Sequence, residues 1–188
     1  MTIKVQTLVC FLAISLGVNL AQPASANQLA IQNAYIEWTA SQLRAGNYLA
    51  DSECNLQRVV ERMKSGRNGN RGFGTAAFSY GDINRDGVED ALVVFNPRQC
   101  DGGNALMNAQ TAVLILSANN GSRYFYDEKR LENLKGLPNN MWAKFKRVKS
   151  NGDITGTAYG YRDADARCCP SLQAAFTYTY QNNKLRIN

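Results

Sequence analysis

The chain has 188 residues, of which 45% are hydrophobic and 19% charged, and its formal net charge is +6. This length suits one domain and leaves too little chain for two. The sequence contains no histidine, which excludes Ser-His-Asp and Cys-His catalysis and makes zinc a poor fit.

The first 26 residues have the pattern of a signal peptide. Lys4 precedes an apolar run over residues 9–18, and residues 24–26 have the small-x-small form of a signal-peptidase site. The apolar run is short for a membrane-spanning helix, so a retained anchor is the weaker alternative. We therefore expect residues 1–26 to be removed. Residues 27–188 should form a single exported domain, periplasmic or extracellular, with no stable membrane insertion after cleavage.

Two helices are predicted at the start of this domain. Residues 27–44 place apolar side chains at i, i+4 and i, i+7 spacing without a proline, and Gly46 follows as a stop signal. Residues 56–63 again place apolar side chains on one helical face, which predicts a second, short helix. The glycine-rich segment 65–74 then predicts a loop.

From residue 75 onward the hydrophobic pattern has the period of two that is typical of strands. Strands joined mainly by short turns are predicted at residues 75–80, 91–95, 111–117, 124–126, 142–149, 154–161, 176–180 and 185–187. This order predicts an α+β fold in which the N-terminal helices pack on an antiparallel sheet of about seven to eight strands. A partly closed β-barrel is the alternative.

Residues 80–95, with the sequence YGDINRDGVEDALVVF, carry the most specific chemistry in the chain. Oxygen ligands recur here at alternating or near-alternating positions around Gly87, and such ligands can converge on one hard cation while the chain reverses direction. The predicted calcium ligands are the side chains of Asp82, Asn84, Asp86 and Asp90 and the carbonyl of Val88.

This pattern is not a complete EF-hand. Val93 stands where a bidentate glutamate is expected, and a predicted strand follows instead of a helix. We therefore expect a shorter calcium loop with a dissociation constant on the order of 0.1 to 1 mM. The alternative is a hairpin loop whose aspartate and asparagine side chains bond only to their own backbone.

Four cysteines follow the predicted signal peptide, namely Cys54, Cys100, Cys168 and Cys169. An even number of cysteines in an exported protein predicts disulfides, and two bridges can form in three pairings. The adjacent Cys168 and Cys169 either form a vicinal disulfide or bridge separately to the other two. Because vicinal disulfides are rare, two ordinary bridges are the simpler arrangement.

The aspartate-rich loop and the cysteine pair together resemble a family of small exported bacterial proteins. Its members combine a GDLNGDGxEDAxVV-type stretch with a later DPxCCPS-type segment, which match residues 81–94 and 165–171 here. Ala166 stands where the pattern often has proline. The resemblance implies an envelope location and this order of elements, and it favours a Cys168–Cys169 bridge together with a Cys54–Cys100 bridge. It transfers no catalytic residue.

No specific reaction follows from these residues. We expect a non-enzymatic binding or structural protein of the cell envelope, stabilised by calcium, whose partner is an envelope protein or a glycan. A glycan-directed hydrolase that uses carboxylates, with Asp163 and Asp165 as the nearest pair, is the first alternative. The second is a nucleic-acid-binding module, because Lys64, Arg67 and Arg71 form a basic loop. A loop exposed to solvent explains these charges more simply, so nucleic acid is not the expected partner.

Overall fold

The computed structural model describes residues 26–46, 72–96, 111–132, 134–138, 141–166 and 169–187. The predicted second helix, the basic loop and Cys54, Cys100 and Cys168 lie outside these ranges, as does the predicted signal peptide except for Ala26. No described helix is long and apolar enough to cross a membrane. The described elements are α1 (Ala26–Arg44), β1 (Gly72–Gly81), β2 (Asp90–Asn96), β3 (Thr111–Ala118), β4 (Arg123–Asp127), α3 (Lys129–Glu132), β5 (Met141–Val148), β6 (Ile154–Gly160), β7 (Leu172–Thr179) and β8 (Lys184–Ile187).

The strands form two four-stranded antiparallel sheets, ordered β1-β2-β3-β4 and β5-β6-β7-β8. The predicted α+β fold with one sheet of seven to eight strands is therefore wrong: the described protein is mostly β, with one N-terminal helix and the single turn α3. The partly closed barrel is wrong as well, because no described strand of one sheet pairs with a strand of the other.

The chain leaves the first sheet directly after β4. The carboxylate of Asp127 accepts the Arg130 N–H at 3.0 Å and so caps α3. Leu131 of α3 is buried in the core that the two sheets share. Capping and burial of this turn place β5 in a new sheet, which the period-two pattern of the strands does not reveal.

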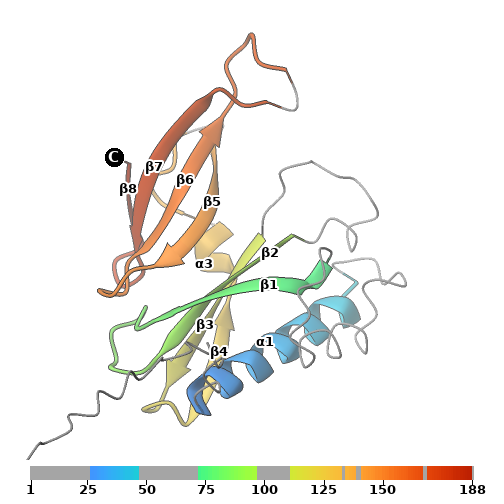
Figure 1. Ribbon diagram of the computed structural model, residues 1–188, viewed down its shortest axis with the longest axis vertical. Coiled ribbons are helices and arrows are strands. Elements are labelled where there is room, and N and C mark those ends of the chain that lie inside the picture. Colours follow the sequence, from blue (N-terminus) through green and yellow to red (C-terminus); the bar gives the residue numbers. More distant parts are fainter. Residues whose placement is uncertain are drawn as a thin grey trace, which may run out of the picture.

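One core lies between α1 and the first sheet (Figure 1). Tyr35 and Trp38 are almost completely buried there. The Tyr35 ring meets Phe78 edge-on, with centroids 5.4 Å apart, and the Trp38 ring meets Phe95 at 5.2 Å. Burying each large apolar side chain of this kind stabilises the fold by about 1.5 to 3 kcal/mol, so α1 is an integral layer of the domain.

A second core fills the space between the two sheets. Alternation along β2 directs Val93 toward α1 and Leu92 toward the second sheet. Leu92 packs in a cluster with Phe176 and Tyr178 of β7, all of them essentially inaccessible to solvent. β2 and β3 are thus covered by α1 on one face and by residues of the second sheet on the other, and Figure 1 shows α1 along the first sheet with the second sheet standing above it.

Candidate functional site

Loop 82–90 connects β1 to β2, and its aspartates accept hydrogen bonds from the backbone of the same loop. Asp82 accepts the N–H groups of Asp86 and Gly87, both at 3.0 Å, on its two carboxylate oxygens. Asp86 Oδ1 accepts the Val88 N–H at 2.9 Å. Side-chain acceptors of this kind replace the ladder bonds that a turning chain loses. Gly87 supplies a φ of 86°, which glycine adopts without strain.

Ser117, at the end of β3, completes the hydrogen bonding of Asp86 and Asn84. Its hydroxyl donates to Asp86 Oδ2 at 2.6 Å, and its carbonyl accepts from Asn84 Nδ2 at 3.0 Å. The same Asn84 nitrogen also donates to Asp86 Oδ2 at 3.0 Å. Burial on its own raises the pKa of Asp86, but hydrogen bonds from Ser117, Val88 and Asn84 outweigh it, and the pKa lies below its ordinary value.

Asp90 lies on the buried side of the loop and is inaccessible to solvent. One of its carboxylate oxygens accepts the N–H groups of Ile83 and Asn84 at 2.8 and 3.0 Å, and the other accepts the Ser117 N–H at 2.7 Å. Burial raises the pKa of Asp90, and these three amides oppose that effect without cancelling it. The residue therefore joins the loop, β2 and β3 at one buried carboxylate.

The exposed side of the loop presents part of the predicted calcium ligand set. Asp82, Asn84 and Asp86 are joined there by the bonds described above, while both oxygens of Asp90 face buried amides. Across the described part of the chain, no three acidic or cysteine side chains are positioned to hold a metal ion. The Asn84 amide oxygen accepts the Asp86 N–H at 3.1 Å, so calcium binding by this loop stays a prediction.

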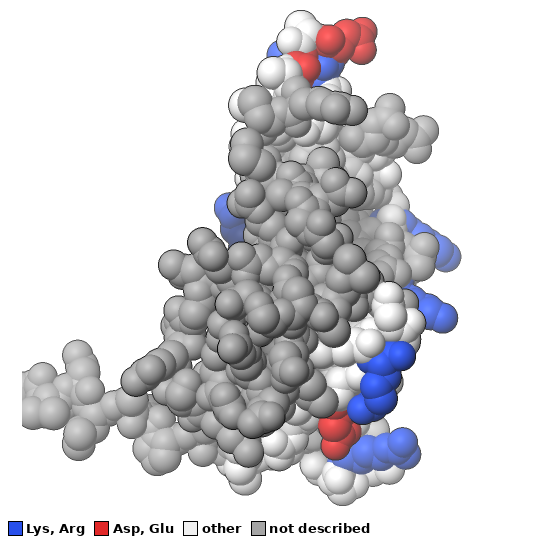
Figure 2. Space-filling view, turned by 90° about the vertical axis from the view of Figure 1, so that its right-hand side faces the viewer, with Lys and Arg blue, Asp and Glu red and all other residues white. Residues whose placement is uncertain are grey.

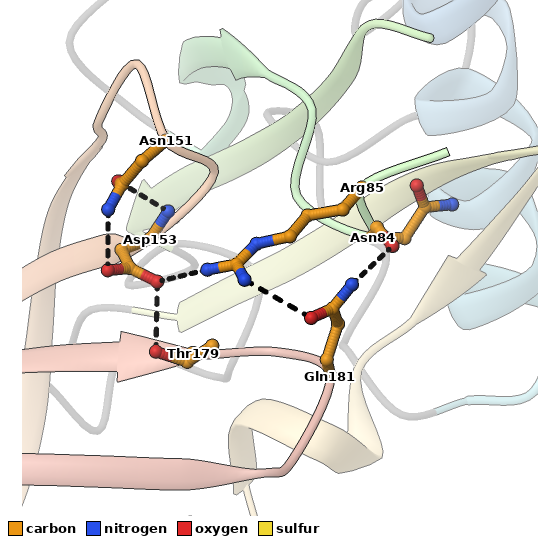
Figure 3. Close-up of polar contacts among 6 residues, drawn as sticks. All are labelled: Asn84, Arg85, Asn151, Asp153, Thr179 and Gln181. Atoms are coloured by element: carbon orange, nitrogen blue, oxygen red, sulfur yellow. Dashed lines mark hydrogen bonds and ion pairs between the residues drawn. The ribbon is translucent and has the colours of Figure 1, made fainter. Parts of the chain in front are cut away.

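Arg85 connects the loop to the second sheet (Figure 3). Its guanidinium donates to Asp153 Oδ1 and to Gln181 Oε1, each at 3.3 Å. The Gln181 amide in turn donates to the Asn84 carbonyl at 3.4 Å. The φ of Arg85 is 60°, an uncommon conformation for a residue with a Cβ, so the loop backbone is strained where this side chain leaves it.

Asp153 accepts two more side-chain hydrogen bonds at the same place and donates one. Thr179 donates its hydroxyl to Oδ1 at 2.9 Å, and Asn151 donates its amide to Oδ2 at 2.9 Å. The Asp153 N–H donates to Asn151 Oδ1 at 3.2 Å. We call loop 82–90, the turn at residues 149–153 and Gln181 the junction, because these connections between strands join one sheet to the other.

Gly152 lets the backbones meet closely at this junction. It is buried at a φ of 82°, and an added Cβ would collide with the carbonyl of Asp82. Nearby, Ser79 of β1 accepts the Val148 N–H of β5 at 2.8 Å. The β5–β6 turn therefore rests on the start of the loop, backbone against backbone.

Asp165, in the β6–β7 connection, is used to shape its own loop. Its Oδ2 accepts the Arg162 N–H at 2.7 Å, the Ser171 N–H at 2.8 Å and the Ser171 hydroxyl at 2.9 Å. The Arg162 N–H, followed by the Ser171 N–H, lowers the pKa of Asp165. Asp163 is exposed in the same connection.

Cys169 is exposed and takes part in a disulfide. Its N–H donates to the Ala166 carbonyl at 2.9 Å. Because Cys54, Cys100 and Cys168 lie outside the described residues, the pairing favoured by the family resemblance stays a prediction.

Several residues that contact loop 82–90 or belong to the junction were not singled out in the sequence. Ser117 had the clearest signal, since it is the polar residue that follows the apolar run 112–116. Arg85, Asp153 and Gln181 are polar residues in turns, and their contact depends on how the two sheets pack.

Comparison of the chain with protein-family models, with curated proteins and with solved structures found no match.

Proposed function

We propose that this chain is an exported, non-enzymatic binding protein of the cell envelope, in which loop 82–90 has a structural role. The observation that carries the proposal is that the loop carboxylates are already hydrogen-bonded within the protein. Both oxygens of Asp82, Asp86 and Asp90 accept hydrogen bonds from the protein itself. A general acid or base must instead reach the proton that it transfers.

The polar residues of the loop can be explained by the contacts that they make at the junction. The hydrogen bonds of Arg85, Asp153 and Gln181 tie the loop to the second sheet, in addition to the apolar core that the two sheets share. Calcium on the exposed side of the loop would add to this role. It would reduce the repulsion between Asp82 and Asp86.

The hydrolase alternative has less support. A glycosidase needs two carboxyl groups that flank the scissile bond. Asp165 already accepts three hydrogen bonds on one oxygen, which suits a residue that shapes a loop.

Export rests on the N-terminal pattern and on the family resemblance. The disulfide at Cys169 agrees with an oxidising compartment, where such bonds persist. Because an exported protein meets the components of the cell envelope, we expect its partner to be an envelope glycan or an envelope protein.

Incubation of the mature protein with isolated cell walls and with soluble polysaccharides tests the proposal. We expect the protein to sediment with insoluble wall material and to release no soluble sugar above a protein-free blank. Mass analysis of the native protein should give Asn27 as its first residue. Release of reducing ends that Asp163→Ala or Asp165→Asn abolishes would establish the hydrolase instead.

A further inference from the structure

The second sheet has one face in the core and one face toward solvent. Along β6, Ile154, Gly156, Ala158 and Gly160 are buried, whereas the residues between them are partly exposed. We call the solvent-side face the outer face of the second sheet. Strand pairing orders it into rows across the sheet, and successive rows are about 7 Å apart because each step along a strand covers two residues.

Aromatic rings cluster at one end of the outer face. Trp142 is paired with Tyr159 across β5 and β6, and their rings are stacked with centroids 6.2 Å apart. Tyr161 adds a third ring, 5.2 Å from Trp142, and is 41% exposed. The Lys144 ammonium lies 5.1 Å from the centre of the Tyr159 ring. This end is therefore a platform of neighbouring rings with a cation beside it.

Basic residues occupy the other end of the same face. Arg147 of β5, Thr155 of β6, Thr177 of β7 and Arg186 of β8 follow one another across the sheet in a single row. Lys184 lies one step further along β8, beside Thr179. Within the described residues, these arginines and this lysine form no ion pair.

The charge on this sheet is entirely of one sign. Its four strands contain the five basic residues Lys144, Lys146, Arg147, Lys184 and Arg186 and no acidic residue. The row between the rings and the basic row contains Lys144 of β5 and Thr157 of β6, and Gln173 of β7 lies beside Tyr159 in the row of rings. The side chains of Thr157 and Gln173 can donate and accept hydrogen bonds. In the space-filling view, basic side chains recur along the right-hand edge, and acidic ones appear beside basic ones at the top and near the bottom (Figure 2).

We propose that the outer face of the second sheet binds an anionic polysaccharide, a glycan chain that carries carboxylate or sulfate groups. This proposal deepens the proposed function and rests on it. The apolar faces of sugar rings stack on the aromatic platform, hydroxyl groups bond to the threonine and glutamine side chains, and acidic groups pair with the basic row. The excess of positive charge is complementary to an anionic chain and to no neutral one.

The site takes an extended ligand, because the platform and the basic row lie at opposite ends of the face. The Trp142 row and the Arg147 row are two steps apart, or about 14 Å at the spacing of strand residues. A single sugar at the rings would not reach the basic row. A chain laid along the strands would contact both, which predicts that short oligosaccharides bind more weakly than long ones.

Binding of three soluble polymers tests the chemistry of the ligand. The probes are polygalacturonate as the carboxylated chain, dextran sulfate as the sulfated chain and dextran as the neutral control, each measured with the full mature protein by affinity electrophoresis. We expect retardation by at least one anionic polymer and none by dextran, and we expect added salt to weaken it. The two anionic arms distinguish carboxylate from sulfate. Retardation by dextran alone, or by no polymer, would overturn the proposal.

Paired variants test the location. Tyr161→Ala should weaken binding by about three- to tenfold, from the loss of one stacked ring. Tyr126→Ala removes a ring of similar exposure, 45%, on the first sheet and should bind as the wild type does. Arg186→Ala should reduce both the affinity and its salt dependence, whereas Arg123→Ala on β4 should change neither. Circular dichroism and melting curves confirm that each variant is folded.

The outcomes separate this proposal from the proposed function. If the variants of the outer face bind as tightly as their controls, the ligand lies elsewhere and this inference fails, while a non-enzymatic binder remains supported. If the wall assay above shows release of sugar, the proposed function fails first. A single-stranded oligonucleotide that displaces the polysaccharide, and that loses affinity in Tyr161→Ala, would show that the face serves nucleic acid.

Discussion

Asp90 is the residue on which loop 82–90 depends most. Its buried carboxylate accepts three backbone N–H groups, and an asparagine in its place must point a donor at one of them. Because a buried donor without an acceptor costs about 1 to 3 kcal/mol beyond the bond that is lost, we expect Asp90→Asn to lower the free energy of unfolding by about 3 kcal/mol. Urea denaturation followed by fluorescence measures it.

Asp82→Asn is the matched control. Asp82 also accepts two backbone N–H groups, from Asp86 and Gly87, but the site is open to water, which can take over a lost bond. The expected loss is about 1 kcal/mol. Equal losses in the two variants would show that burial of Asp90 does not increase its contribution to the free energy of unfolding.

Asp86 should make stability depend on pH in acid. Burial alone would raise the pKa of Asp86, but its hydrogen bonds bring it below the ordinary value of 3.8. A lowered pKa stabilises the fold above the unfolded pKa, and that contribution disappears as the pH falls through the folded pKa. The pKa of Asp90 is raised by burial, so its contribution has the opposite sign and is lost as the pH rises.

Asp86→Asn isolates the first effect. The difference in unfolding free energy between the wild type and this variant should shrink as the pH falls below about 4. Urea denaturation at several pH values down to about 2 measures it. A difference that stays constant over this range would mean that the carboxylate is not held in its charged form.

At the scale of single residues, the sequence predicted where the loop lies but not which of its side chains are exposed and which are buried. Alternating Asp and Asn around Gly87 predicted that these side chains come together, and Asp82, Asn84 and Asp86 do. The sequence pattern treats Asp90 as equivalent to them, because spacing alone does not show which side of a loop becomes buried. Ser117 is 27 residues further along the chain, so only the pairing of β2 with β3 brings it to Asp90.

At the scale of elements, the junction depends on close backbone contact. An added Cβ at Gly152 would collide with the Asp82 carbonyl, at a φ that already disfavours other residues. Gly152→Ala must therefore push the β5–β6 turn away from loop 82–90. We expect a loss of about 3 kcal/mol or more in unfolding free energy, as for other strained or overpacked sites, measured by urea denaturation.

Gly87→Ala separates collision from backbone strain. Gly87 has a similar φ of 86°, but an added Cβ there meets no atom within 4 Å. Its replacement should cost only the left-handed conformation, about 1 to 2 kcal/mol. If Gly87→Ala destabilises the protein as much as Gly152→Ala does, the contact between turn and loop contributes nothing measurable.

The individual elements were largely predictable, because their signals are local. The helix predicted at residues 27–44 is confirmed as α1, and the strands predicted at residues 111–117 and 124–126 are confirmed as β3 and β4. These two strands pair through a short turn with positive φ at residues 119, 120 and 121. Periodicity and turn residues report on neighbours in the sequence, and these features depend on little else.

At the scale of the whole molecule, local signals were not sufficient. The split into two sheets is decided where Asp127 caps α3 and Leu131 enters the core between the sheets. Period-two alternation is the same whether a strand extends one sheet or begins another. β2 and β3 are buried on both faces, so their apolar residues fit a central position in one large sheet as well as in the smaller sheet that is present.

The junction makes calcium a test of the whole molecule. Asp82 Oδ1 accepts the backbone N–H of Asp86 at 3.0 Å, so two acidic residues share the exposed side of the loop. Like charges about 4 Å apart repel by about 1 kcal/mol in a wet site, and a divalent cation reverses the sign of this term. Because Arg85 leaves the same loop for Asp153, ordering the loop should stabilise the contact between the sheets as well as the hairpin.

Calcium should therefore raise the melting temperature of the entire domain in one transition. Binding to the folded chain alone stabilises it by RT ln(1 + [L]/Kd), which is about 1.4 kcal/mol at ten times the dissociation constant and moves Tm by a few degrees. Magnesium should act less, because it gives up its water reluctantly. Asp86→Ala should abolish the response, and Asp163→Ala, in the distant β6–β7 connection, should retain it. If millimolar calcium and EDTA give the same wild-type melting curve, the hydrogen bonds of loop 82–90 suffice without an ion.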